Sequence, residues 1–154
     1  MSDQAQGLRR WAERQALQAT GAEQTLVVVG PPSVVRQAQA TLQRWRAAGH
    51  CWVGEPSRWH MLALTADGPR VAEWARQYPR WGLWLGAGPN DCRQAYLQVR
   101  RLALAGGPRR LLLLHGGLAA RRAQVDNLCH ATARFLGVEL LVMAERQYDL
   151  SRLK

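Results

Sequence analysis

A histidine and two glycines follow the longest leucine run of the chain, and they are the first candidates for chemistry. Leu111 to Leu114 lead directly into His115, Gly116 and Gly117. Such a run is typical of a buried strand, and at its end an imidazole could contact a ligand or exchange a proton. The alternative is a polar side chain that is satisfied within the protein and closes the strand. We favour this alternative.

Two further apolar runs also end in loop-forming residues. The run 26–29 ends in segment 30–33, Gly-Pro-Pro-Ser, and the run 83–85 ends in segment 86–90, Gly-Ala-Gly-Pro-Asn. These loops would share one edge of a parallel sheet, where open α/β folds bind ligands. Dinucleotide binding is not expected, because the first loop has one glycine and its two prolines lack the amide hydrogens that hold a pyrophosphate. A Walker A phosphate loop is excluded, since no Gly-Lys-Ser or Gly-Lys-Thr occurs.

The second of these loops resembles a family motif. Residues 85–89 resemble the glycine-rich first motif of S-adenosylmethionine-dependent methyltransferases, and residues 30–33 resemble their Pro-Pro catalytic motif in permuted order. The resemblance covers nine residues and implies a nucleotide-derived ligand. The chain departs from the family at Trp84, where an acidic residue is usual, and at both ends of segment 30–33. We favour the simpler interpretation that Gly86 and Gly88 let a strand turn into a helix.

Signatures of metal binding and of nucleophilic catalysis are weak. Histidines and cysteines do not have the paired spacing of zinc sites; they stand at His50, Cys51, His60, Cys92, His115, Cys129 and His130. The carboxylates are too scattered for two-metal or acid–base chemistry. We therefore expect no metal, no cofactor and no catalytic residue, and we expect the cysteines to be buried, reduced thiols.

The charge of the chain is strongly positive and almost entirely due to arginine. The formal net charge is +10, from 21 basic and 11 acidic residues. Arg36, Arg93, Arg121 and Arg122 fall at the starts of expected helices, where the helix dipole disfavours cations. With nearby amides they would form an anion-attracting surface, but we favour the simpler interpretation that these side chains point outward and are solvated. A second group, at positions 100, 101, 109 and 110, is expected on the opposite edge as a solvated face.

The spacing of apolar residues predicts alternating strands and helices. Strands are expected at 26–29, 81–85, 110–114 and 138–143, and helices at 3–20, 33–49, 67–79, 90–105 and 118–136. Ser33 is a good N-cap residue, and the last helix is expected to bury Val125, Leu128, Thr132 and Phe135. Residues 50–65 are expected to form an antiparallel hairpin, because the turn at 54–57 is too short for a crossover helix. The predicted fold is an α/β, three-layer, Rossmann-like sandwich with a mostly parallel sheet and an extra N-terminal helix.

Length and composition indicate the number of domains and the expected cellular location. A chain of 154 residues suits one α/β domain, 1–154, with the N-terminal helix within 1–21 and a polar tail at 145–154. No segment approaches the roughly 20 apolar residues that cross a bilayer, and residues 1–6 lack the features of a secretory signal. We therefore expect a cytoplasmic protein with no membrane span.

The tryptophans are unusually many, at seven. Trp52, Trp59, Trp81 and Trp84 do not fit one core face, so we expect some of them to be exposed and to bind a partner. The edge of the expected hairpin also suits dimerisation or strand addition.

Together these patterns favour a non-catalytic binding, adaptor or regulatory module that engages a protein partner, a second copy of itself or an anionic ligand. One alternative is an enzyme that uses the crevice at the strand ends. The other is a nucleic-acid-binding protein that uses Arg9, Arg10 and Arg14 with the second arginine group. The candidate crevice consists of Gly30, Ser33, Arg36, Gly86, Gly88, Asn90, Asp91, Arg93, His115, Gly116, Gly117, Arg121 and Arg122.

Overall fold

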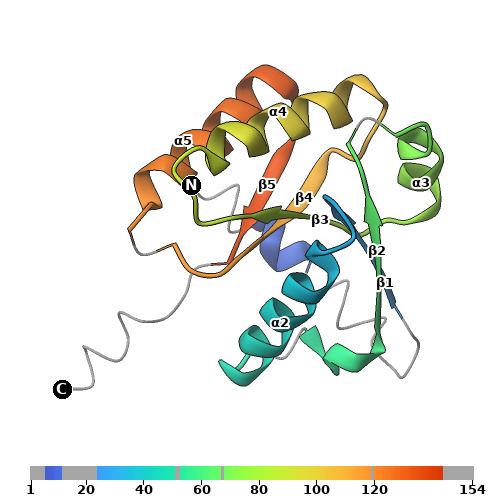
Figure 1. Cartoon of the computed structure of the whole chain (residues 1–154), viewed down its shortest axis with the longest axis vertical. Helices are drawn as coiled ribbons and strands as arrows, with labels where there is room; N and C mark the ends of the chain where they lie inside the picture. The colour runs from blue at the N-terminus through green and yellow to red at the C-terminus, as the bar shows by residue number, and fades with distance from the viewer. Residues whose placement is uncertain (1–5, 12–23, 51–52, 67, 119, 144–154) are drawn as a thin grey trace.

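The computed structural model describes residues 6–11, 24–50, 53–66, 68–118 and 120–143 (Figure 1). Residues 6–11 are helical. The elements that follow are β1 (Gln24–Val29), α2 (Val34–Ala47), the 3₁₀ turn η2 (Pro56–Arg58), β2 (Trp59–Leu64), α3 (Val71–Gln77), β3 (Trp81–Leu85), α4 (Asp91–Leu104), β4 (Arg110–His115), α5 (Arg122–Ala131), the π-helical turn η3 (Thr132–Leu136) and β5 (Glu139–Val142).

The strands form one five-stranded sheet in the order β2-β1-β3-β4-β5, and all neighbouring pairs are parallel. The predicted α/β class is confirmed. This order is that of a doubly wound sheet, because the chain moves from β1 to one side and then returns past β1 to the other side. The direction changes between β1 and β3, which makes the carboxyl ends of these two strands the switch point of the fold.

The helices cover both faces of the sheet (Figure 1). Right-handed crossovers place helices on one face when the chain moves one way across the sheet and on the other face when it moves back. The single step from β1 to β2 therefore puts α2 on one face, and the three steps in the opposite direction put α3, α4 and α5 on the other. Residues 6–11 share the face of α2, because Leu8 and Trp11 pack against the same buried cluster as Trp45 of α2.

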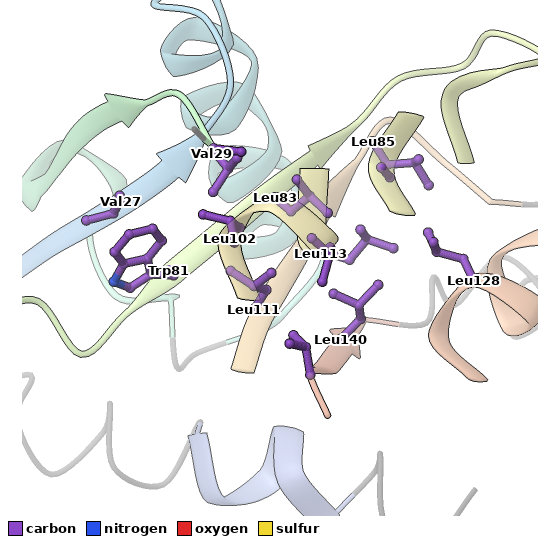
Figure 2. Close-up of a cluster of buried hydrophobic side chains, with 14 of the residues drawn as sticks. Val27, Val29, Trp81, Leu83, Leu85, Leu102, Leu111, Leu113, Leu128 and Leu140 are labelled. Atoms are coloured by element: carbon purple, nitrogen blue, oxygen red, sulfur yellow. The ribbon is translucent and has the colours of Figure 1, made fainter. Parts of the chain in front are cut away.

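Two apolar clusters form the core, and the alternation of side chains along each strand divides residues between them. In β4, Leu111 and Leu113 face α4 and α5, whereas Leu112 and Leu114 face α2. Figure 2 shows the first cluster, where Trp81 lies among leucine and valine side chains of β1, β3 and β4. Because these strands are buried on both faces, their sequences are continuous runs of apolar residues rather than alternating apolar and polar residues.

The antiparallel hairpin expected over 50–65 is wrong. β2 pairs with β1 in parallel, from Gln24 opposite Trp59 to Val29 opposite Leu64. The crossover helix that this pairing requires is α2 itself, which precedes the turn at 54–57. Val53 is not in a strand but in the connection from α2 to β2, where its carbonyl accepts a hydrogen bond from the indole of Trp59 (2.7 Å).

The end of the last helix also differs from the prediction. After Ala131 the helix widens into the π turn η3, and Gly137 ends it in the left-handed conformation (φ +66°). The wider turn changes the helical register, so Thr132 and Leu136 face the core while Phe135 is 69% exposed. The prediction that Phe135 is buried is therefore wrong. The helix expected within 1–21 is confirmed for residues 6–11, and its remainder and the tail 145–154 lie outside the described residues.

Candidate functional site

The candidate crevice lies at the carboxyl edge of the sheet, where the loops after three adjacent strands emerge. These loops follow β1, β3 and β4, which neighbour one another in the sheet. They carry the predicted site glycines at 30, 86, 88, 116 and 117, and they include the switch point between β1 and β3. The topology thus brings together segments that are up to 87 positions apart in the sequence, from Gly30 to Gly117.

The loop after β1 makes a tight turn that is held by hydrogen bonds between the loop and the start of α2. Gly30 adopts φ +146°, and a Cβ at this position would come within 2.8 Å of Val34. The two prolines that follow donate no hydrogen bonds, and the amides of Val34 and Val35 donate to their carbonyls (2.9 and 3.2 Å). Ser33 stands at the N-cap position of α2, as predicted, but its side chain makes no capping hydrogen bond. This loop therefore turns the chain tightly and offers few amides to a phosphate.

The loop after β3 is occupied by a carboxylate of the protein. Oδ2 of Asp91, at the start of α4, accepts a hydrogen bond from the amide of Gly88 (2.7 Å). A Cβ on Gly86 would overlap the same carboxylate. An acidic side chain at a helix start stabilises the helix in two ways. It accepts a hydrogen bond from an otherwise free amide, and its negative charge interacts favourably with the helix dipole. The position where a ligand anion would bind is thus filled by Asp91, while Asn90 beside it is exposed and makes no capping bond.

Arg121 joins two of the loops. Its guanidinium donates to the carbonyl of Gly86 (2.7 Å), across 35 positions of sequence. The side chain is half-buried at the N-terminal boundary of α5. Arg121 therefore fixes the loop after β3 against the loop after β4.

His115 is fully buried and satisfied within the protein. Its Nδ1 accepts a hydrogen bond from the amide of Gly117 (3.1 Å), and its Nε2 lies 3.4 Å from the carbonyl of Met143. The donated bond to Nδ1 assigns the proton of a neutral ring to Nε2, which faces an acceptor. The ring also packs edge-on against Trp45, with 5.8 Å between ring centroids. These contacts match the interpretation of His115 as the residue that closes the strand.

Arg44 also contacts the end of β4, and the sequence does not predict this contact. Its guanidinium, on α2, donates to the backbone carbonyl of His115. In the sequence, Arg44 is one of many arginines on an expected helix, and nothing in its spacing distinguishes it. Only the packing of α2 over the end of β4 gives it this role.

Three arginines of the candidate site remain exposed at helix starts: Arg36 on α2, Arg93 on α4 and Arg122 on α5. None of them makes an ion pair with another residue that the structure describes. The first turns of α2 and α5 contain no acidic residue, whereas the first turn of α4 contains Asp91. A shallow groove of about 930 Å³ runs along the outer face of α2 and includes Ser33, Arg36 and Gln43.

Two tryptophans of the expected partner surface, Trp59 and Trp81, are buried. Trp59 is 6% and Trp81 is 1% exposed, and both indole N–H groups donate to backbone carbonyls. Trp84 is half-buried against the cluster under α2, and Trp52 lies outside the described residues. The prediction considered one core face, whereas a doubly wound sheet has two, and Trp81 and Trp84 lie on opposite ones.

The second arginine group lies at the opposite, amino edge of the sheet. Arg110 begins β4 and pairs with Glu139 of β5 (Nε to Oε1, 3.1 Å). Arg100 and Arg101, near the end of α4, are exposed, as is Arg109. This group is separate from the candidate crevice.

Within the described residues, no group of three or more metal-ligating side chains gathers, and none of the helices there is long and apolar enough to cross a bilayer. Cys92 and Cys129 are thiols that pack partly into the core under α4 and α5. Comparison of the chain with protein-family models, with curated proteins and with solved structures found no significant match.

Proposed function

We propose that this protein is a non-catalytic binding module whose carboxyl edge recognises an anionic partner through Arg36, Arg93 and Arg122. The observation that carries the proposal is the contrast between two sets of side chains at this edge. His115, Asp91 and Arg121 are engaged by the protein's own backbone. The three arginines at the helix starts are exposed, and none of them makes an ion pair with another described residue.

The proposed partner is an acidic protein surface. Exposed arginines at helix starts lie in an unfavourable dipole field, and a carboxylate that binds there relieves it while forming bidentate hydrogen bonds. The net charge of +10 speeds association with such a surface by electrostatic attraction. We also propose a cytoplasmic setting, in which Cys92 and Cys129 persist as thiols.

The test uses the purified protein, immobilised and exposed to a nuclease-treated extract of its own host at about 0.15 M salt. The variant Arg36→Glu/Arg93→Glu/Arg122→Glu is compared with Arg9→Glu/Arg10→Glu/Arg76→Glu, which makes the same change in charge at exposed positions outside this edge. We expect an acidic host protein to be retained by the wild type and by the control variant. We expect its retention by the first variant to fall at least about tenfold.

Three results would overturn the proposal. Equal loss in both variants would indicate a general effect of charge. Binding that requires intact nucleic acid would favour the nucleic-acid alternative, for which Arg9 and Arg10 are candidates. A small molecule that co-purifies in native mass spectrometry and raises the melting temperature would favour the crevice enzyme.

A further inference from the structure

Two large apolar side chains are exposed at the amino edge of the molecule, away from the proposed arginine site. Leu104, the last residue of α4, is 79% exposed, and Phe135, in η3, is 69% exposed. Both stand at the carboxyl-terminal ends of helices on the same face of the sheet, and η3 packs against α4. In the part of the chain that the structure describes, no other large hydrophobic side chain is exposed to this degree.

The exposure of Phe135 results from a specific local geometry. An uninterrupted α-helix would place residue 135 on the buried stripe with Leu128 and Thr132, at spacings of seven and three residues. The π turn instead directs Leu136 to the core and Phe135 to solvent. Single π turns of this kind are frequent at functional sites.

Arginines lie beside each of these two side chains. Arg100 and Arg101 precede Leu104 by four and three residues, so they lie on the same side of α4 as Leu104, and both are exposed. The guanidinium of Arg134 lies 5.7 Å from the ring centre of Phe135. Glu139, the acidic residue of nearby β5, is paired with Arg110. Each of the two exposed apolar side chains therefore has an exposed arginine beside it on the same element.

We infer that this surface, formed by Leu104 and Phe135 with Arg100, Arg101 and Arg134, docks an acidic protein segment that carries apolar side chains. Charge complementarity selects the occupant: carboxylates pair with the arginines while an aliphatic or aromatic side chain covers the two apolar ones. A second copy of this chain is disfavoured, because a two-fold interface would bring the same arginines against each other. A nucleic acid would use the ring of Phe135 but would gain little from Leu104, which has no π face.

The test selects displayed random peptides on the wild-type protein, with counter-selection on Leu104→Ala/Phe135→Ala. We expect enriched peptides that combine Asp or Glu with Leu, Phe or Trp, and affinity measured by fluorescence anisotropy that falls at least about tenfold in the double variant. Arg100→Glu/Arg101→Glu should weaken binding similarly. Arg36→Glu/Arg93→Glu/Arg122→Glu should weaken binding less than Arg100→Glu/Arg101→Glu does, although it changes the net charge more, and this separates the surface from the proposed carboxyl-edge site. Circular dichroism confirms that each variant is folded.

The inference fails if no peptide is enriched, if enriched peptides lack acidic residues, or if they bind the double variant as tightly as the wild type. It also fails if the wild type binds single-stranded DNA or vesicles of anionic phospholipid and the double variant alone loses that binding. A dimer seen in sedimentation that Leu104→Ala/Phe135→Ala dissociates would assign the surface to a second copy instead.

Discussion

His115 shows how burial changes the meaning of a residue that looks catalytic in the sequence. Its position after a leucine run is compatible with a ligand site and with a closed strand end. Full burial, two partners for the ring nitrogens and the contact with Trp45 favour the second. Both ring nitrogens have partners within the protein, which favours a contribution of the ring to stability.

We predict that His115→Ala lowers the free energy of unfolding by about 2–4 kcal/mol, because it leaves a cavity beside Trp45 and unpaired backbone groups near residues 117 and 143. Urea unfolding followed by tryptophan fluorescence measures this. His130→Ala, at an exposed position on α5, is the control and should change stability by less than about 0.5 kcal/mol. If His115→Ala were as stable as the wild type, the ring would be available to a ligand and the crevice alternative would regain support.

At the same scale, the sequence could indicate which residues gather at the carboxyl edge but not what each one contacts. The glycines at strand ends and the arginines at helix starts follow from local patterns. The bond from Arg121 to Gly86 and the bond from Arg44 to His115 depend on packing between distant segments, and no local spacing encodes them. The filling of the loop after β3 by Asp91 was also missed, although an acidic residue three positions after Gly88 is a recognisable signal.

At the scale of elements, the strands and helices were predictable because burial on both faces produces continuous apolar runs, and amphipathic helices separate them. Two errors have physical causes. The hairpin was inferred from a short turn without considering that α2 could serve as the crossover. The π turn was missed because regular periodicity assumes a constant register to the end of a helix.

The register of η3 leads to a prediction about two adjacent residues. Phe135→Ala should change the free energy of unfolding by less than about 0.5 kcal/mol, since the ring is largely in solvent. Leu136→Ala should lower it by about 1–3 kcal/mol, because Leu136 packs against the core. Chemical denaturation of both variants checks this. A larger loss of stability for Phe135→Ala than for Leu136→Ala would indicate that Phe135, and not Leu136, packs against the core.

At the scale of the whole molecule, the class and the parallel sheet were predictable, whereas the strand order was not. Each strand is an apolar run with little to identify its neighbours, and the order depends on which helices fit on which face. The order determines local stability: β4 lies between β3 and β5 with Leu111 to Leu114 fully buried, whereas β2 lies at an edge with His60 exposed.

We therefore predict that amide hydrogens of residues 111–115 exchange at least about tenfold more slowly than those of residues 60–64 under native conditions. Hydrogen-exchange mass spectrometry with peptides from β4 and β2 measures this. Within each experiment, β1 provides an internal reference, because it is paired on both sides. Equal exchange in β2 and β4 would mean that the sheet opens only as one unit.

The strand order also bears on how the chain assembles as it is synthesised. β1 comes first among the strands and lies inside the sheet, and β2, β3, β4 and β5 each pair with a strand that precedes them in the sequence. A nascent chain can therefore extend the sheet outward from β1 with every new strand, and no strand has to wait for a partner that the ribosome has not yet made. The next strand covers the open edge of β1, then of β3 and then of β4, while the outer edge of β2 stays uncovered, which shortens the time for which apolar strands such as β4 are exposed to aggregation.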